Sequence, residues 1–479
     1  MATTNGNRKI LDLKRWEFCT PAPAATGAGH FISSSRHFKQ QQLLVQSNTA
    51  QYLYNPNEDG WVLLPSAALA GTYGAGACGA AGAWSTGATV GAAFLTATSG
   101  TTTTLVTNQT LVRDMRGYAI QILSGPGAGD TRTIASNTIG ANATITVTTP
   151  FTSAITSSST YRLLTPTWFV LGAGVLATGS FKKYDLATNT WTSLSIASLP
   201  ASVGTDGKLI TTPSIIDSSV VSFATGTATS CDASTLVNSA KTWTVNQWAN
   251  SQIRITSGTG AGQIRTISSN TGTAITVSAN WTTIPDATSQ YSIEGNDDYI
   301  YYIGNNAVTT YRYSISTNTW TALTPTAARA AVGGTGLSGH WVYGVTDSAW
   351  SNESAIINGR RIYSLRGAAG AVLDYYDIAL NTWVSGVTYA PATETFTTGT
   401  KYTYNENYLY IQKDATGRWF RFNFVTSEMD GWNTMTYTQG AALVGDTCFD
   451  ITYSDGATSI TYVYMILNTS NVMLRQMVV

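Results

Sequence analysis

The sequence predicts an all-β protein, and three observations support this fold class. Thr, Ser, Gly and Ala dominate the small and polar positions, aromatic residues make up 11% of the 479 residues, and a tyrosine–tryptophan pattern recurs at a fixed spacing. Thr and aromatic side chains favour strands, whereas Gly favours the turns between them. A signal of fixed period also indicates the architecture more strongly than any local propensity.

The recurring pattern is Tyr-x6-Trp, with a polar, turn-forming stretch between the two aromatic residues. Two aromatic strand ends around a loop rich in Asn, Asp, Thr and Gly are typical of a β-hairpin. A looser fifth copy runs from Phe422 to Trp432. The four regular copies are Tyr54–Trp61, Tyr184–Trp191, Tyr313–Trp320 and Tyr376–Trp383.

Each copy belongs to a longer unit with one plan. An apolar strand, a turn containing Gly or Asn, and a second strand ending in Tyr precede the polar turn and the strand that opens with Trp. Repetition of this plan predicts a β-propeller of five or six blades, each with three to four strands. The chain ends with two strands that lack a closing Trp, so we expect the first residues of the chain to supply the missing strand of the last blade.

Two inserted modules explain why the motif tryptophans are unevenly spaced. The intervals are 130, 129, 63 and 49 residues, whereas a blade takes roughly 40–50. Similar segments begin at Thr96 and Thr227, and both contain a Gly-Ala-Gly turn, a following Arg, and Ser-Asn-Thr before an alternating strand. We expect these homologous β-modules between the first and second blades and between the second and third, as surfaces for neighbours or ligands. Their turn residues are Gly127, Gly129, Arg132, Gly260, Gly262 and Arg265.

These patterns divide the chain into six predicted segments. They are an N-terminal arm that closes the last blade (1–30), the first blade with a Gly/Ala-rich segment (31–92), module 1 (93–165), a blade (166–222), module 2 (223–295), and the remaining blades (296–479).

The charge composition excludes a nucleic-acid-binding surface made of clustered Lys and Arg. Charged residues make up only 11% of the chain, against roughly 25% in an average soluble domain. Acidic and basic residues balance at 26 each. A net charge near zero favours association between copies.

The cysteines and the N-terminus exclude several other classes. Cys19, Cys78, Cys231 and Cys448 lie far apart with no Cys-x-x-Cys pair, which favours free, buried thiols over zinc ligands or disulfides. Free thiols are consistent with assembly in a reducing cytoplasm. The first 18 residues have no apolar signal-peptide core, and the uncharged stretch 67–95 is too rich in Gly, Ala, Ser and Thr for a membrane span. We interpret that stretch as a packed loop region followed by strands.

We expect no catalytic, cofactor or metal site. A copper radical oxidase of propeller fold needs two His and two Tyr ligands, but of the three His in the chain, His30 and His37 both precede the first complete blade and His340 stands alone. A sialidase box is also absent, because the SDG at Ser454 lacks the spacing and the Trp. These observations favour a protein that is not an enzyme.

Four local motifs have a functional and a structural interpretation, and the structural one is favoured for each. NPNEDG (55–60) resembles a calcium loop but places Ser66 where the bidentate Glu belongs. GPGAGD and GTGAGQ resemble phosphate-binding loops but precede strands, which favours tight turns. The charges at 113–116 favour a solvated face. GRWFRF (417–422) favours a half-buried strand over a surface that stacks on sugars or bases.

Both repeats resemble known families. The Tyr-Asp-x-x-x-Asn-x-Trp stretches look like kelch-type propeller blades, and the Gly-Ala-Gly-x-x-Arg module with its Ile-Thr-Val strand resembles a β-module of structural proteins in tailed-bacteriophage virions. The uncharged run from Leu64 also looks like segments of such proteins.

The phage resemblance implies a virion structural protein that is assembled in the host cytoplasm. The role it favours is a tail component of nozzle or tail-tube type, which forms a homo-oligomeric ring, contacts other tail, adaptor or portal-proximal proteins, and lets DNA pass without sequence-specific binding. Collar, head-fibre and capsid-decoration roles stay open. The alternative is a carbohydrate-binding propeller that attaches to a host surface glycan.

Overall fold

A computed structural model describes the chain in a series of ranges, and throughout them the protein is all-β, with strands and turns and no helix. The described residues are 16–23, 31–35, 37–38, 43–46, 50–65, 77–87, 89–204, 207–211, 214–216, 219–220, 222–304, 308–329, 339–341, 361–365, 372–388, 401–404, 408–413, 418–424, 426, 428–434, 447–454, 459–466 and 471–478. No helix within these ranges is long and apolar enough to cross a membrane.

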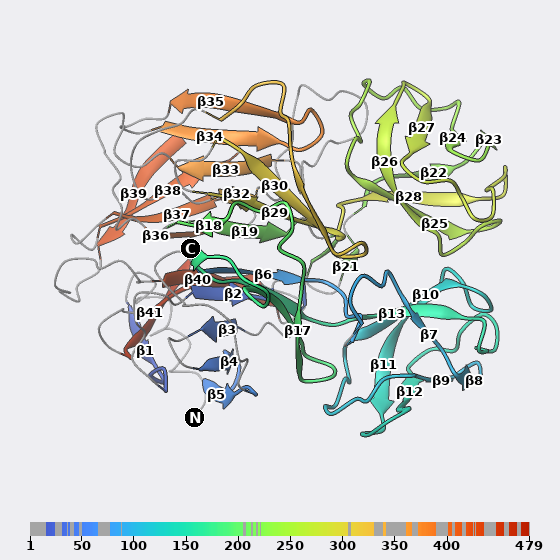
Figure 1. Cartoon of the computed structure of the whole chain (residues 1–479), viewed down its shortest axis with the longest axis horizontal. Coiled ribbons are helices and arrows are strands. Elements are labelled where there is room, and N and C mark those ends of the chain that lie inside the picture. The colour runs from blue at the N-terminus through green and yellow to red at the C-terminus, as the bar shows by residue number, and fades with distance from the viewer. Residues whose placement is uncertain are drawn as a thin grey trace, which may run out of the picture.

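Most described strands belong to six antiparallel sheets of four strands (Figure 1). Sheet I contains β2 (Phe31–Ser34), β3 (Leu43–Gln46), β4 (Gln51–Asn55) and β5 (Gly60–Leu63). Sheet II contains β6 (Cys78–Gly82), β14 (Thr167–Leu171), β16 (Phe181–Asp185) and β17 (Thr190–Ser193). Sheet III contains β19 (Lys208–Thr211), β29 (Tyr299–Ile303), β30 (Thr310–Ser314) and β31 (Thr319–Ala322).

The other three sheets come from the C-terminal part of the chain and from one N-terminal strand. Sheet IV contains β32 (Gly339–Trp341), β33 (Arg361–Leu365), β34 (Val372–Asp377) and β35 (Thr382–Thr388). Sheet V contains β36 (Lys401–Tyr404), β37 (Tyr408–Lys413), β38 (Arg418–Asn423) and β39 (Glu428–Thr434). Sheet VI contains β40 (Thr447–Ser454), β41 (Ser459–Ile466), β42 (Met473–Val478) and β1 (Glu17–Cys19).

Sheet VI joins the two ends of the chain, as the sequence led us to expect. Strand β1 pairs with β42, with Glu17 opposite Arg475 and Cys19 opposite Met473. The Nε of Arg475 also donates to Oε2 of Glu17 at 3.1 Å. The N-terminal residues therefore supply the fourth strand of the last sheet.

Each sheet packs against the next one in chain order, and the sixth packs against the first. Sheets I, II and III share one apolar core, and separate clusters join III to IV, IV to V, and V to VI. Tyr54 of sheet I and Tyr464 of sheet VI lie in a further cluster, with ring centroids 6.2 Å apart. The first strands β2, β6, β19 and β32 contact one another in order, and β40 contacts both β36 and β2.

The two modules are seven-stranded sheets with the same strand order. Module 1 has the order β7 (Leu95–Thr96), β13 (Thr160–Leu164), β10 (Ala119–Ser124), β11 (Thr131–Asn137), β12 (Thr144–Val147), β9 (Thr104–Val106) and β8 (Ser99–Gly100). Module 2 has the order β22 (Ser222–Thr227), β28 (Gln290–Glu294), β25 (Gln252–Ser257), β26 (Ile264–Asn270), β27 (Ala274–Val277), β24 (Thr235–Val237) and β23 (Ser230–Cys231). Two short ribbons pair β15 (Gly174–Val175) with β18 (Ser202–Val203) and β20 (Ile215–Ile216) with β21 (Ser219–Val220).

The insertion points differ from the prediction, because each module interrupts a sheet instead of lying between two sheets. Module 1 follows β6, the first strand of sheet II, and module 2 follows β19, the first strand of sheet III. The sequence of β6, CGAAG, has neither β-branched nor large side chains, so it gave no strand signal. Small residues are needed there, since a Cβ on Gly82 would lie 3.0 Å from the Phe169 ring.

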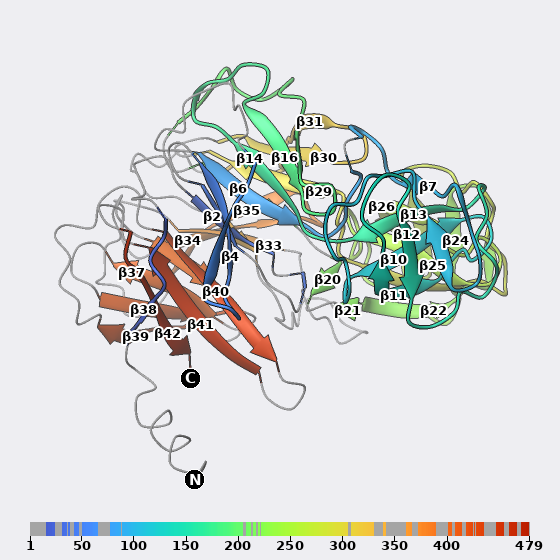
Figure 2. The ribbon, with the colours of Figure 1, turned by 90° about the horizontal axis from the view of Figure 1, so that it is seen from below.

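The modules lie beside each other on one side of the six sheets. Figure 1 places module 1 below module 2 at the right of the view, and Figure 2, turned by 90°, again places both at that side. The fold thus presents a paired projection built from the two homologous insertions.

Candidate functional site

The Tyr-x6-Trp motif forms the same closed hairpin in all four regular copies. The tyrosine hydroxyl donates to a side-chain oxygen five residues later, and that residue has a left-handed backbone, which favours Asn and Asp. The four bonds are Tyr54 to Asp59 (2.5 Å), Tyr184 to Asn189 (2.5 Å), Tyr313 to Asn318 (2.7 Å) and Tyr376 to Asn381 (2.6 Å). Burial raises the pKa of these hydroxyls, that of Tyr184 to about 12, so they remain protonated donors.

Each motif tryptophan joins its sheet to the preceding one. The indole lies on the motif tyrosine, with ring centroids 4.8 to 5.5 Å apart. Its Nε1 donates to a group in or just after the preceding sheet: Trp61 to Thr20 (3.1 Å), Trp191 to Pro65 (3.1 Å), Trp320 to Ser195 (3.0 Å) and Trp383 to Thr310 (2.9 Å). The eight motif residues therefore stabilise the arrangement of the sheets.

The fifth copy does not reproduce this geometry. Phe422 pairs with Met429, and the register shifts between Trp419 and Phe420. Met429 thus takes the position of the motif tryptophan, seven residues after Phe422, and Trp432 lies further along β39 at the bulge.

The Gly-Ala-Gly turns of the modules are the places where the two modules meet. A Cβ on Gly129 would lie 3.0 Å from the Thr256 carbonyl oxygen, and a Cβ on Gly262 would lie 2.5 Å from that of Leu123. Gly129 corresponds to Gly262 and Leu123 to Thr256 in the repeat alignment. The contact therefore has the reciprocal form of a two-fold interface, in which the same patch is used by both partners.

The arginine after each turn has a structural role. Arg132 donates to Asp130 at 2.6 Å and to the Pro150 carbonyl at 2.8 Å. Arg265 donates to the carbonyls of Asn280 and Ile264 at 3.0 and 2.8 Å. Their guanidinium groups thus fasten the turn to the neighbouring loop, and the tight-turn interpretation describes the site better than a phosphate loop does.

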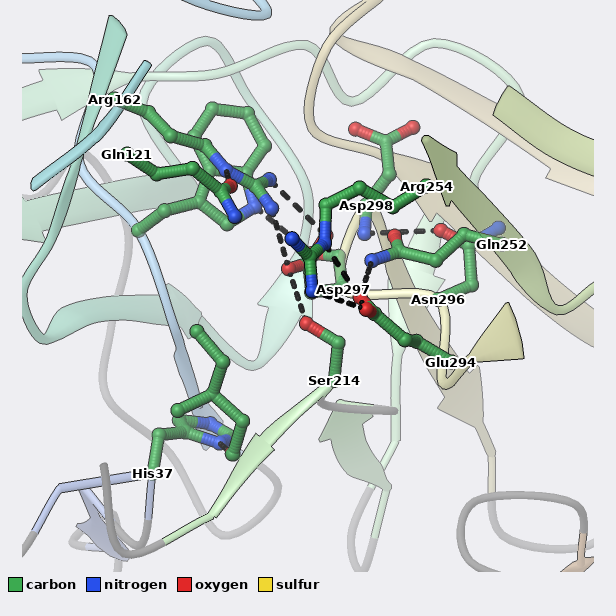
Figure 3. Close-up of polar contacts among 12 residues, drawn as sticks. His37, Gln121, Arg162, Ser214, Gln252, Arg254, Glu294, Asn296, Asp297 and Asp298 are labelled. Atoms are coloured by element: carbon green, nitrogen blue, oxygen red, sulfur yellow. Dashed lines mark hydrogen bonds and ion pairs between the residues drawn. The ribbon is translucent and has the colours of Figure 1, made fainter. Parts of the chain in front are cut away.

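A buried ion pair connects module 1 to the segment after module 2 (Figure 3). Both terminal nitrogens of Arg162 contact the Asp297 carboxylate, at 3.3 and 3.2 Å, and both side chains are buried. The Nε of Arg162 donates to Gln121 (2.9 Å), and Ser214 donates to Asp297 (2.7 Å). Such a pair is costly to break, because removing one partner leaves a buried charge.

Module 2 contains its own buried pair. The Nε and one terminal nitrogen of Arg254 donate to Oε1 of Glu294 at 3.0 and 2.6 Å, and Gln252 donates to Oε2 at 3.2 Å. Next to it, Asp298 accepts hydrogen bonds from Ser314 and Ser316, at 2.6 to 3.0 Å. Burial nevertheless raises the pKa of Asp298 to about 6.

A cleft of about 670 Å³ lies where the modules meet the sheets. Its walls come from the glycine turns of both modules, from the end of sheet III at Ser316, and from the segment around Phe94. Arg162, Gln252, Asn296, Asp297 and Asp298 line its polar part. This volume is within the range of ligand-binding pockets, roughly 300–1,000 Å³.

The residues considered for metal or radical chemistry have other partners. Asp59 of the calcium-like loop accepts from Tyr54 and from the Thr20 amide and hydroxyl. His37 is buried, with Nδ1 3.1 Å from the Ile215 carbonyl oxygen and Nε2 2.8 Å from that of Ala81. Because a carbonyl oxygen only accepts, His37 makes both hydrogen bonds at once only when both ring nitrogens carry a proton. His30 lies outside the described residues. Within the described ranges there is no group of three or more His, Cys, Asp or Glu that could hold a metal ion.

Cys19, Cys78 and Cys231 are free, and Cys19 and Cys78 are buried. Burial raises the pKa of both thiols to about 12, which makes them unreactive. The solvated face expected at 113–116 holds for the exposed Arg116–Asp114 pair, but not for Arg113. Arg113 instead donates to Tyr184 and Asn189 at 3.3 Å, which links module 1 to the hairpin of sheet II.

No protein-family model matches the chain, and a search of the curated proteins finds no match.

Proposed function

We propose that the six sheets are the blades of a β-propeller. Three features support this: each of the six sheets is antiparallel with four strands, each packs against the next and the sixth against the first, and the N-terminal strand completes the last sheet. In such an architecture the first strands lie innermost and only short edges remain exposed.

On this basis the chain is a structural protein of a tailed-bacteriophage virion and has no enzymatic activity. We favour a place in the tail, as a nozzle or tail-tube component. The observation that carries the proposal is the paired projection of homologous modules, fastened to each other by equivalent glycine turns and to the sheets by Arg162 and Arg113. A rigid block with such a projection is suited to contacts between identical subunits in a ring. In a closed ring, one surface patch of each subunit contacts a different patch of the next subunit.

The charge distribution supports a lumen for DNA passage in this proposal. Charged residues make up only 11% of the 479 residues, and acidic and basic residues balance at 26 each. A lumen with few Lys or Arg would contact few phosphates, so DNA would pass without being held.

The test is the oligomeric state of the full-length chain, measured by size exclusion with light scattering and by electron microscopy over a range of concentrations. We expect rings of defined stoichiometry. Ile139→Lys and Val245→Lys, at exposed apolar positions of the two modules, should weaken the ring, whereas Val175→Lys, at an exposed position in β15, should not. A strict monomer at high concentration would overturn the ring.

The position in the virion is tested separately by labelling purified phage particles with antibodies against the chain. Labelling at the tail supports the nozzle or tail-tube role. Labelling at the collar, at head fibres or over the capsid would move the protein to one of those sites, and absence from virions would overturn the virion proposal.

A second candidate function is attachment to a host carbohydrate, and the cleft between the modules is the observation that favours it. The cleft combines an exposed aromatic ring with fixed amides and carboxylates. An array of immobilised glycans that retains none of the protein would eliminate this candidate.

A further inference from the structure

The cleft between the modules has the features of a preformed binding site. It is lined from three directions, by the glycine turns of both modules, by Asp297 and Asp298 after β28, and by Phe94 before β7. Sites of this kind are common where domains meet, and they place a few fixed polar groups in a mainly apolar wall.

The polar groups of the cleft are held in place before any ligand arrives. The planar guanidinium of Arg162 is fixed by Gln121 and Asp297, and the Asn296 amide donates to Asn250 (3.2 Å) and Thr266 (3.1 Å). Figure 3 shows these side chains gathered between strands of the two modules. A ligand that binds them needs little reordering of the protein, which favours affinity.

The charges that line the cleft balance one another. Arg162 is paired with Asp297 at 3.2 Å, so this part of the wall carries no net charge. The second cation, Arg265, and the second carboxylate, Asp298, are each occupied by several internal hydrogen bonds. An anionic ligand such as a phosphate needs unneutralised cations, and a cationic ligand needs free carboxylates. The lining therefore favours an uncharged ligand rich in hydroxyl groups.

The apolar part of the cleft is an aromatic ring open to solvent. Phe94 has 48% of its surface exposed, beside the small side chain of Ala93. A ligand that covers a large, exposed aromatic side chain removes much apolar surface from water, and this contributes favourably to the free energy of binding. Saccharides present apolar C–H faces and hydroxyl edges together, which matches a wall with one ring and several amides and carboxylates.

We propose that this cleft binds a short, uncharged oligosaccharide, with Phe94 against a sugar face and Arg162, Gln252 and Asn296 near its hydroxyl groups. The inference rests on the second candidate function and gives that function a location. It does not depend on the ring or on the place of the protein in the virion.

The experiment uses the full-length chain on an array of neutral, sialylated and sulfated oligosaccharides, followed by calorimetry with the best neutral compound. Two variants address the cleft: Phe94→Ala, which removes the ring, and Thr283→Trp, which fills the space from an exposed position on its wall. Each has a matched control. Phe18→Ala removes an exposed Phe from β1, and Ser153→Trp alters the position in module 1 that corresponds to Thr283.

We expect binding of at least one neutral oligosaccharide, about tenfold weaker in Phe94→Ala, undetectable in Thr283→Trp, and unchanged in both controls. If both cleft variants still bind neutral oligosaccharides, the cleft is not the binding site, but attachment to a host carbohydrate remains supported. Binding only of sulfated or sialylated compounds would contradict the proposal that the ligand is uncharged. If no glycan binds, the inference and the second candidate function both fail, whereas the ring is judged by its own measurement.

Discussion

At the scale of single residues, the Asn or Asp five positions after each motif tyrosine determines the hairpin geometry. It adopts a left-handed backbone, with φ between 47° and 53°, and its side-chain oxygen accepts from the tyrosine. The sequence predicted the aromatic pair correctly as a hairpin signal. It did not reveal that this residue also contacts the preceding sheet, as Asn318 does with the Ser195 amide at 2.9 Å.

Asn318→Ala should therefore destabilise the protein by about 2 kcal/mol, because it removes two hydrogen bonds and leaves a β-carbon at positive φ. Asn318→Gly should cost about 1 kcal/mol less, since Gly adopts this backbone without strain. Urea denaturation measures both, with Thr317→Ala at the same exposed turn as the control. Equal losses for Ala and Gly would show that the backbone conformation does not matter.

Asp298 gives a pH-dependent prediction at the same scale. Its pKa is raised by burial to about 6 in the folded protein, from the ordinary aspartate value of 3.8. The folded state therefore binds the proton more tightly, and its stability should fall as pH rises from about 4 to about 6. Because solvent screens a partly exposed group, the free energy of unfolding should fall by about 2 kcal/mol over this range, less than the full pKa shift implies. In Asp298→Asn the urea midpoints at pH 4 and pH 7 should differ less than in the unmodified protein. An equal difference in both proteins would contradict the raised pKa of Asp298.

At the scale of elements, the repeats predicted most hairpins, because aromatic and β-branched residues mark the strands and Asn, Asp and Gly mark the turns. Strand β6 was missed because CGAAG has the composition of a loop. Its strand character comes from pairing with β14, where Trp168 and Phe169 lie opposite Ala81 and Ala80. Large residues on one strand require small ones on the other, and this complementarity is visible only once the pairing is known.

The contact between the module turns can be tested with a pair of glycine substitutions. Gly262→Ala places a Cβ 2.5 Å from the Leu123 carbonyl oxygen, so it should separate the modules and cost about 3 kcal/mol. Gly140→Ala is the matched control, since φ there is also positive but nothing lies within 4 Å. Hydrogen exchange should report faster exchange at both turns in Gly262→Ala alone. Identical exchange in the two variants would mean that the turns do not support each other.

At the scale of the whole molecule, the sequence predicted an all-β chain with two homologous insertions, but it could not predict how the insertions meet. Arg162 and Asp297 are 135 residues apart in two different repeat units, and neither unit's sequence indicates that the two residues pair. Their pairing depends on where sheets II and III place the two modules. The cleft was missed for the same reason, because its lining comes from segments that only the complete fold brings together.

The N-terminal strand provides a prediction at this scale. Deletion of residues 1–23 removes β1 and the Thr20 groups that bind Asp59 and Trp61, and it exposes the edge of β42. We expect a lower melting temperature and aggregation, since unpaired edges associate. Deletion of residues 1–15 should change neither, and a peptide of residues 16–23 should restore the longer deletion. Equal melting of the two truncated proteins would contradict this role for β1.

The pairing of β1 with β42 also has a consequence for how the protein is made. Glu17 is synthesised 458 positions before its partner Arg475. At ordinary rates of translation the first strand waits roughly half a minute or more before the last one exists. On a crowded polysome that interval is long enough for the strand to meet β42 of a neighbouring copy whose synthesis is complete. We therefore expect that copies made close together can exchange their first strands, a form of domain swapping.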